Sequence, residues 1–153
     1  KVNKRHKIEH SKLLSLLQKE KLDGLYSQKT YEDFSKRVMA LKGDLVSYLK
    51  KLKKRKKHIV GYGAAAKGNI LLNYFGINGQ ILDYLVDSTP YKQGLYSPGT
   101  YIPIYEESRI YDTKPDYLLL LAWNFKDEIL SKNKAFKRLG GHFIIPNPKV
   151  EII

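Results

Sequence analysis

The chain has 153 residues, of which 42% are hydrophobic, and a formal net charge of +13. This length suits one domain that buries roughly two-thirds of the surface exposed by its unfolded form. The sequence has no apolar run long enough to cross a membrane, no secretory signal at its start and no cysteine, which excludes disulfides and thiolate zinc sites within the chain. We therefore expect a cytoplasmic protein without a membrane partner.

Residues 1–10 are polar and rich in cations, and we expect them to form a terminal segment outside the core. Because the chain begins at Lys1 rather than Met, we expect a piece of a longer protein. His6, Glu9 and His10 match the His-x-x-Glu-His pattern of one group of metalloproteases. The match lies in a cationic terminal segment without enough apolar support to fix it and has no evident third ligand, so chance explains it better and no metal site is predicted.

Residues 11–56 are predicted to form two helices that precede the sheet. A leucine-rich stretch indicates a short helix that ends near Gly24. Thr30 then has the sequence features of an N-cap, with acidic residues following it. From residue 31 to about 56, apolar residues recur at steps of three and four, which predicts one long amphipathic helix. Packing against the following α/β unit is a commoner use of such a stripe than a coiled-coil seam.

Seven of the eight residues from Lys50 to Lys57 are basic. They fall at the end of the long predicted helix, where cations suit the helix dipole and long side chains are easily solvated. No aromatic residue is interleaved to stack on bases. We therefore predict a solvated helix end that does not bind nucleic acid.

Residues 57–153 alternate between strand-like and helix-like segments. This alternation predicts an α/β, Rossmann-like three-layer fold with a mainly parallel sheet and flanking helices, preceded by the long N-terminal amphipathic helix. The expected strands are 57–61, 81–87, 117–122 and 142–145, with a short extended segment at 101–104. The expected helices are 65–75 and 125–138, with a possible helical turn from Glu106 and a loop rich in Gly, Pro and Tyr at 88–100.

A glycine-rich turn follows the first of these strands. Gly61-x-Gly63-x-x-Ala66 fits a dinucleotide fingerprint, and Asp87 ends the next strand, 24 residues after Gly63. Such a turn lets a ligand approach the main chain, and the helix after it offers unpaired N–H groups to an anion. Lys67 in the first helical turn suits a bound anion, although an exposed lysine at a helix start explains it about equally well.

In a parallel sheet, ligands bind beyond the carboxyl ends of the strands. We therefore expect four segments to meet at one rim, although Trp123 can also be read as core and Asn124 as a helix cap. The segments are Gly61 to Asn69, Asp87 to Gly99, Trp123-Asn124 and Pro146-Asn147-Pro148. No catalytic triad can be assembled from the histidines, and no catalytic residue is predicted. The candidate substrate-binding residues are Tyr62, Gly63, Ala64, Ala65, Lys67, Gly68, Asn69, Asp87, Tyr91, Lys92, Gln93, Trp123 and Asn124.

Six segments of the sequence form a recognisable series: G-Y-G-A-A-A-K-G-N (61–69), L-L-N-Y (71–74), V-D-S-T-P-Y-K-Q-G (86–94), S-P-G-T-Y-I-P-I (97–104), K-P-D-Y-L-L-L-L-A-W-N (114–124) and G-G-H-F-I-I-P-N-P (140–148). In this order they resemble the C-terminal domain of the sugar C-methyltransferases, which use S-adenosylmethionine to methylate deoxysugars carried on a nucleoside diphosphate. The resemblance covers about residues 11–153, and Ala65 and Ala122 depart from prolines common in that family.

The resemblance implies that this chain helps to hold a nucleoside-diphosphate sugar in deoxysugar biosynthesis. It also implies that upstream domains bind zinc and S-adenosylmethionine and carry most catalytic residues, so this segment alone is expected to be inactive. Two other functions remain open at this stage. An NAD(P)-binding domain of a redox enzyme would use Asp87 on the adenosine ribose, and a basic nucleic-acid-binding module would show steep salt dependence.

Overall fold

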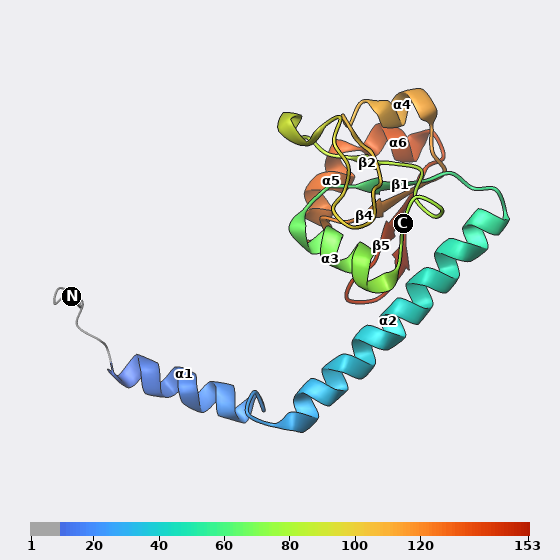
Figure 1. Ribbon diagram of the computed structural model, residues 1–153. Helices are drawn as coiled ribbons and strands as arrows, with labels where there is room; N and C mark the ends of the chain where they lie inside the picture. Colours follow the sequence, from blue (N-terminus) through green and yellow to red (C-terminus); the bar gives the residue numbers. More distant parts are fainter. Residues whose placement is uncertain (1–9) are drawn as a thin grey trace. The chain divides into compact units, whose positions relative to one another are not determined.

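The computed structural model describes residues 10–153 (Figure 1). The chain divides between Ala40 and Leu41 into two compact units, and each is described by itself. His6 and Glu9 of the metalloprotease-like pattern lie outside the described residues.

The first unit holds α1 (His10–Leu22) and the first part of α2 (Gln28–Lys54). All residues of α1 are described and none is buried. The two predicted helices are confirmed, with one correction at the start of the second. Thr30, the predicted N-cap, lies inside α2 because the helix already begins at Gln28, and its N–H donates to the Ser27 carbonyl at 3.1 Å.

The second unit contains a six-stranded sheet in the order β3-β2-β1-β4-β5-β6. Each neighbouring pair is parallel except β5 and β6, which are antiparallel, so the sheet is mixed. The strands are β1 (Ile59–Tyr62), β2 (Leu85–Val86), β3 (Ile104–Tyr105), β4 (Tyr117–Leu120), β5 (His142–Ile145) and β6 (Glu151–Ile152).

Two strand predictions need correction. The predicted strand 81–87 is reduced to β2, because the N–H groups of Ile81 and Leu82 both donate to the Asn78 carbonyl and form a turn. The two side chains are nevertheless buried, which explains their strand-like sequence. The antiparallel strand β6 was not predicted.

The helices of the second unit differ from the prediction mainly at one point. The expected helix 125–138 is split at Asn133, whose buried side chain donates to the Ile129 carbonyl at 2.9 Å and to the Tyr62 hydroxyl at 3.1 Å. An asparagine that bonds backbone in this way competes with the helical ladder. The helices are α3 (Ala66–Phe75), α4 (Arg109–Thr113), α5 (Lys126–Lys132) and α6 (Lys134–Arg138), with 3-10 turns at Pro90–Lys92 and Trp123–Phe125.

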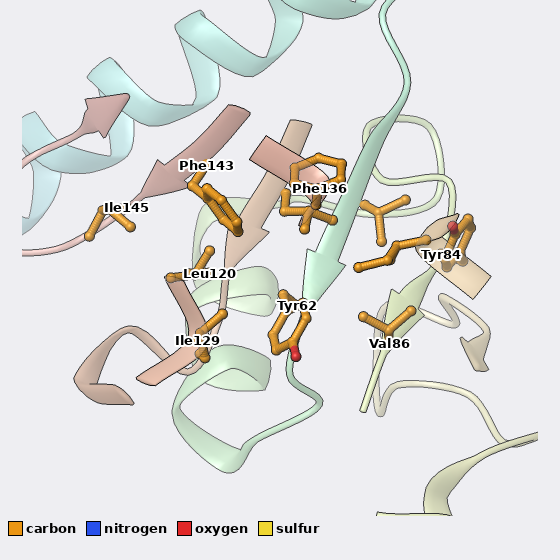
Figure 2. Packing of buried hydrophobic residues seen from close by; sticks show 11 residues of the cluster. Tyr62, Tyr84, Val86, Leu120, Ile129, Phe136, Phe143 and Ile145 are labelled. Atoms are coloured by element: carbon orange, nitrogen blue, oxygen red, sulfur yellow. The ribbon is translucent and has the colours of Figure 1, made fainter. Parts of the chain in front are cut away.

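One face of the sheet packs against α4, α5 and α6. Ile110, Ile129 and Phe136 from these helices join side chains that alternate along β1 and β4. Figure 2 shows Phe136 beside this face, with Tyr62 at the carboxyl end of β1. The opposite face carries α3, where Gly68 lies against Leu121. Burial on both faces accounts for the unbroken apolar run in β4.

The basic end of α2 is only partly the solvated helix end that the sequence predicted. The ammonium group of Lys53 pairs with Asp83, and that of Lys57 pairs with Asp116, both at 2.7 Å. Burial opposes ionisation of Asp116, but the hydrogen bonds from Lys57 and the His58 N–H lower its pKa. Lys54, by contrast, is exposed, as are Lys50, Lys51, Arg55 and Lys56.

Among the described residues, no helix combines the length and apolar character that a membrane crossing requires.

Two helical glycines provide a matched test of how closely α3 packs. A Cβ on Gly68 would lie 2.7 Å from the Leu121 Cβ, whereas a Cβ on Gly43 in α2 would meet no atom within 4 Å. We expect Gly68→Ala to lower the free energy of unfolding by about 1–3 kcal/mol through overpacking. Gly43→Ala should raise it by about 0.5–1 kcal/mol, because alanine favours the helix. Urea denaturation of both variants tests this, and equal effects would contradict the packing of α3 on β4.

Candidate functional site

A cleft of about 300 Å³ lies where β1, β2 and β4 end. From the neighbouring strands β1 and β4, the chain adds β2 and β3 on one side and β5 and β6 on the other, so the strand order reverses between β1 and β4. Ligands bind beyond the carboxyl ends of strands at such a reversal. The lining combines carboxylates, hydroxyls, one lysine and apolar side chains. Its residues are Tyr62, Gly63, Ala65, Asp87, Ser88, Thr89, Glu107, Ala122, Phe125, Glu128, Ile129 and Lys132.

The turn after β1 brings the main chain close to the end of β4. Gly63 has a φ of +95°, which side chains rarely tolerate, and a Cβ there would lie 3.0 Å from the Ala122 Cβ. The Gly63 N–H donates to the Val86 carbonyl at 2.7 Å. The turn is therefore fixed between β2 and β4, and Gly63 and Ala65 of this turn line the cleft.

Asp87 is the centre of the hydrogen bonds that hold this turn. Asp87 is only 7% exposed, and its carboxylate accepts the Ala64 N–H at 2.6 Å and the Thr89 N–H at 2.9 Å. Lys92 adds an ion pair at 3.3 Å. Burial opposes ionisation of Asp87, but the hydrogen bonds from Thr89, Ala64 and Lys92 outweigh it and lower the pKa.

The predicted residues after β2 have different surroundings. Lys92 also donates to the Ala64 carbonyl at 3.2 Å, and Gln93 donates to the Asp87 carbonyl at 3.0 Å. Lys92 therefore bonds to the turn after β1 and Gln93 to the segment after β2, and neither side chain lines the cleft. Tyr91 is 79% exposed and projects into solvent.

The first turn of α3 places its predicted residues in three environments. Lys67 is exposed, and its ammonium group lies 5.5 Å from the centre of the Trp123 ring. Gly68 is buried against Leu121. Asn69 donates its N–H to the Ala65 carbonyl at 3.0 Å, while its Oδ1 is buried without a hydrogen-bond partner among the described residues.

Asn124 is exposed and does not cap the next helix. Phe125 occupies the position before α5, and no side chain caps that helix. Trp123 is only partly buried, packing against the edge of the core. Neither residue lines the cleft, although both belong to the turn that follows β4.

A polar network that sequence reasoning missed forms one wall of the cleft. The Tyr62 hydroxyl donates to Glu107 Oε1 at 2.6 Å and accepts the Asn133 amide, while Lys132 pairs with Glu107 Oε2. Burial, followed by the hydrogen bond to Glu107, raises the pKa of Tyr62, so the phenol stays protonated at neutral pH. Glu107 could have been named from the sequence, because it comes just after β3, at the end of the strand where ligands bind. Lys132 and Asn133 lie within or after a helix, and nothing in their sequence surroundings indicates a site.

Of the predicted site residues, four line the cleft: Tyr62, Gly63, Ala65 and Asp87. Ala64, Lys92 and Gln93 hold the turn in place, and the other predicted residues lie around it. Within residues 10–153, no three His, Asp or Glu side chains gather closely enough to hold a metal ion.

Comparison with known proteins gives two matches. A family model described as the C-methyltransferase C-terminal domain matches residues 1–148. The C-methyltransferase NovU of Streptomyces niveus is 35% identical over 138 residues, which is 90% of this chain. The chain spans about a third of the length of that relative, 33%.

We expect Asp87→Asn to lower the free energy of unfolding by about 1.5–3 kcal/mol at neutral pH, since it weakens hydrogen bonds to a charged acceptor. The folded-state pKa of Asp87 lies below its ordinary value of 3.8. Its contribution is therefore complete well above pH 3.8 and is lost as the pH falls through the folded-state pKa. Urea denaturation should show the difference from the unmodified protein narrowing below pH 4.

The exposed aspartate of α2 supplies the control for this prediction. Asp44→Asn removes the same charge on the surface and should change stability by less than about 0.5 kcal/mol. A difference between the unmodified protein and Asp87→Asn that stays constant from pH 7 to pH 3 would contradict the role of the ionised carboxylate.

Proposed function

The chain belongs to the family of C-methyltransferase C-terminal domains, and we propose that it helps to bind the nucleoside-diphosphate-sugar substrate of an S-adenosylmethionine-dependent C-methyltransferase. The observation that carries this proposal is the fixed turn after β1, which leads into α3 beside a polar cleft. The ligand's diphosphate would lie against this turn.

The start of α3 has the properties of an anion site. The first N–H groups of a helix have no partner within the helix, and their dipoles favour negative charge. Ala65 precedes the helix in an extended conformation and supplies no side-chain cap. The Ala64 N–H is already bonded to Asp87, but Ala65 is half-buried and Ala66 is exposed, and their small side chains leave the start of the helix accessible to a ligand.

Lys67 is the cation best placed to meet the diphosphate. Two other lysines near the turn are already paired, Lys92 with Asp87 and Lys132 with Glu107. Lys67 instead extends over the Trp123 ring, on the surface of the first helical turn. A charge-assisted hydrogen bond from this side chain would offset part of the charge of the ligand.

We also propose that the second unit is Rossmann-like. Its strand order β3-β2-β1-β4-β5-β6 agrees with the dinucleotide-binding order, apart from the antiparallel β6. The glycine turn after β1 and the aspartate after β2 stand at the expected places. These features support a nucleotide ligand across the ends of β1 and β4.

The redox alternative is disfavoured by the state of Asp87. A dinucleotide-binding domain uses this carboxylate on the ribose hydroxyls. Here it already accepts two N–H groups and an ammonium group, out of about four positions that a carboxylate offers. The nucleic-acid alternative has the basic end of α2 as its main support, and two of those lysines form ion pairs.

On this proposal the methyl donor, which supplies the methyl group, and zinc are bound by parts of the enzyme other than this chain. The residues of this chain orient the sugar nucleotide. The proposal concerns binding, and the chain by itself is expected to lack methyltransferase activity.

We expect Lys67→Glu to weaken binding of thymidine diphosphate glucose by tenfold or more, because it replaces an attraction to the diphosphate with a repulsion. Isothermal titration calorimetry measures the affinity. Lys54→Glu, an exposed lysine on α2, makes the same change in net charge and should leave the affinity within about twofold.

Three outcomes would count against the proposal. Equal affinities in Lys67→Glu and the unmodified protein would remove the turn from the binding site. An equal loss in both lysine variants would indicate an effect of net charge alone. Binding of reduced nicotinamide dinucleotide in preference to the sugar nucleotide would favour the redox alternative.

A further inference from the structure

The cleft beside the glycine turn is acidic, although the chain as a whole is strongly basic. Three carboxylates line it, those of Asp87, Glu107 and Glu128, against the single lysine Lys132. The acidic part of the cleft therefore repels a diphosphate, since like charges close together are unfavourable, whereas the start of α3 carries Lys67 and no carboxylate. An uncharged group rich in hydroxyls suits it better, because carboxylates accept hydrogen bonds from hydroxyl donors.

The three carboxylates differ in what they can still bind. Asp87 is occupied by Ala64, Thr89 and Lys92. Glu128 is exposed on α5. Glu107 is 20% exposed and accepts two donors, the Tyr62 hydroxyl and Lys132, which leaves about half of its acceptor positions for a ligand.

Glu107 is also held in place from both sides. Tyr62 is 4% exposed and fixed by the amide of Asn133, which is 3% exposed. Lys132, at the end of α5, forms an ion pair with the second carboxylate oxygen of Glu107. A group held by two such donors loses little freedom on binding, which favours affinity and selectivity.

The remaining wall of the cleft is apolar. Ala122, Phe125 and Ile129 stand among its lining residues. A sugar ring presents hydroxyls at its edge and C–H groups on its faces, so this combination of a fixed carboxylate and an apolar wall fits it. Both sugars of a sugar nucleotide, the ribose and the glycosyl group, have these hydroxyls and C–H groups. They lie on opposite sides of the diphosphate, so a diphosphate bound at the turn allows only one of them to enter the cleft.

We propose that Glu107 is a specificity-determining residue that accepts hydrogen bonds from hydroxyls of the glycosyl group, with the diphosphate at the start of α3 beside Lys67. This inference rests on the proposed function and adds the orientation of the ligand. The glycosyl end enters the acidic cleft, and the nucleoside end extends away from it.

The test compares two ligands, thymidine diphosphate glucose and thymidine diphosphate, by calorimetry on the full chain. Glu107→Gln removes the charge and half of the acceptor positions while keeping the length of the side chain. We expect it to weaken binding of the sugar nucleotide about tenfold and to leave thymidine diphosphate within about twofold. Glu106→Gln is the matched control, since Glu106 is the exposed neighbour and should alter neither affinity.

Each other result has a definite meaning. An equal loss for both ligands, or no loss for either, would overturn the inference. In either case, a loss in Lys67→Glu would leave the proposed function standing. If the unmodified chain binds neither ligand, the proposed function fails and this inference fails with it.

A second variant covers the case in which Glu107→Gln does not fold. Glu107→Asp keeps the charge and shortens the side chain by one methylene. It should weaken binding of the sugar nucleotide severalfold and leave the affinity for thymidine diphosphate unchanged. Circular dichroism melting curves of both variants separate loss of fold from loss of binding.

Discussion

The hydrogen bond from the Ala64 N–H to the Asp87 carboxylate joins the two loops on which the candidate site depends. It ties the turn after β1 to the segment after β2, and Lys92 closes the same arrangement by bonding both Asp87 and the Ala64 carbonyl. With Gly63 pressed against Ala122 on the other side, the turn has little freedom left. The start of α3 follows directly on this fixed turn, and main-chain N–H groups in a fixed position cost a ligand less to engage than groups that must first be ordered.

The central strands and the glycine turn could be predicted from the sequence because their causes are local. β1 and β4 are continuous apolar segments, and Gly63 needs a backbone conformation that glycine adopts freely. β6 could not be predicted, because it is only two residues long and too short to show a periodic pattern. It is defined by its pairing with β5. The break at Asn133 depends on a hydrogen bond to Tyr62, 71 residues away in sequence.

The candidate site divides in the same way. Residues of the turn could be named from a motif, and Tyr62, Gly63, Ala65 and Asp87 do line the cleft. Glu107 and Lys132 could not be paired from sequence, because Glu107 lies in the loop after β3 and Lys132 is the last residue of α5, 25 residues further along the chain. Lys92 and Gln93 were predicted to line the site, yet their hydrogen bonds show that they support it.

The chain as a whole has a net charge of +13, whereas the cleft is lined by more carboxylates than lysines. Much of the positive charge lies at the end of α2, where Lys53 and Lys57 pair with the loops before β2 and β4. Those loops are at the amino ends of the strands, while the cleft is at their carboxyl ends. A positive surface attracts an anionic ligand over a long range, but screening limits that attraction to about 10 Å at moderate salt. On the proposed function, orientation would then depend on the few charges within reach, Lys67 at the start of α3 and Glu107 in the cleft, because their opposite signs would distinguish one end of a sugar nucleotide from the other.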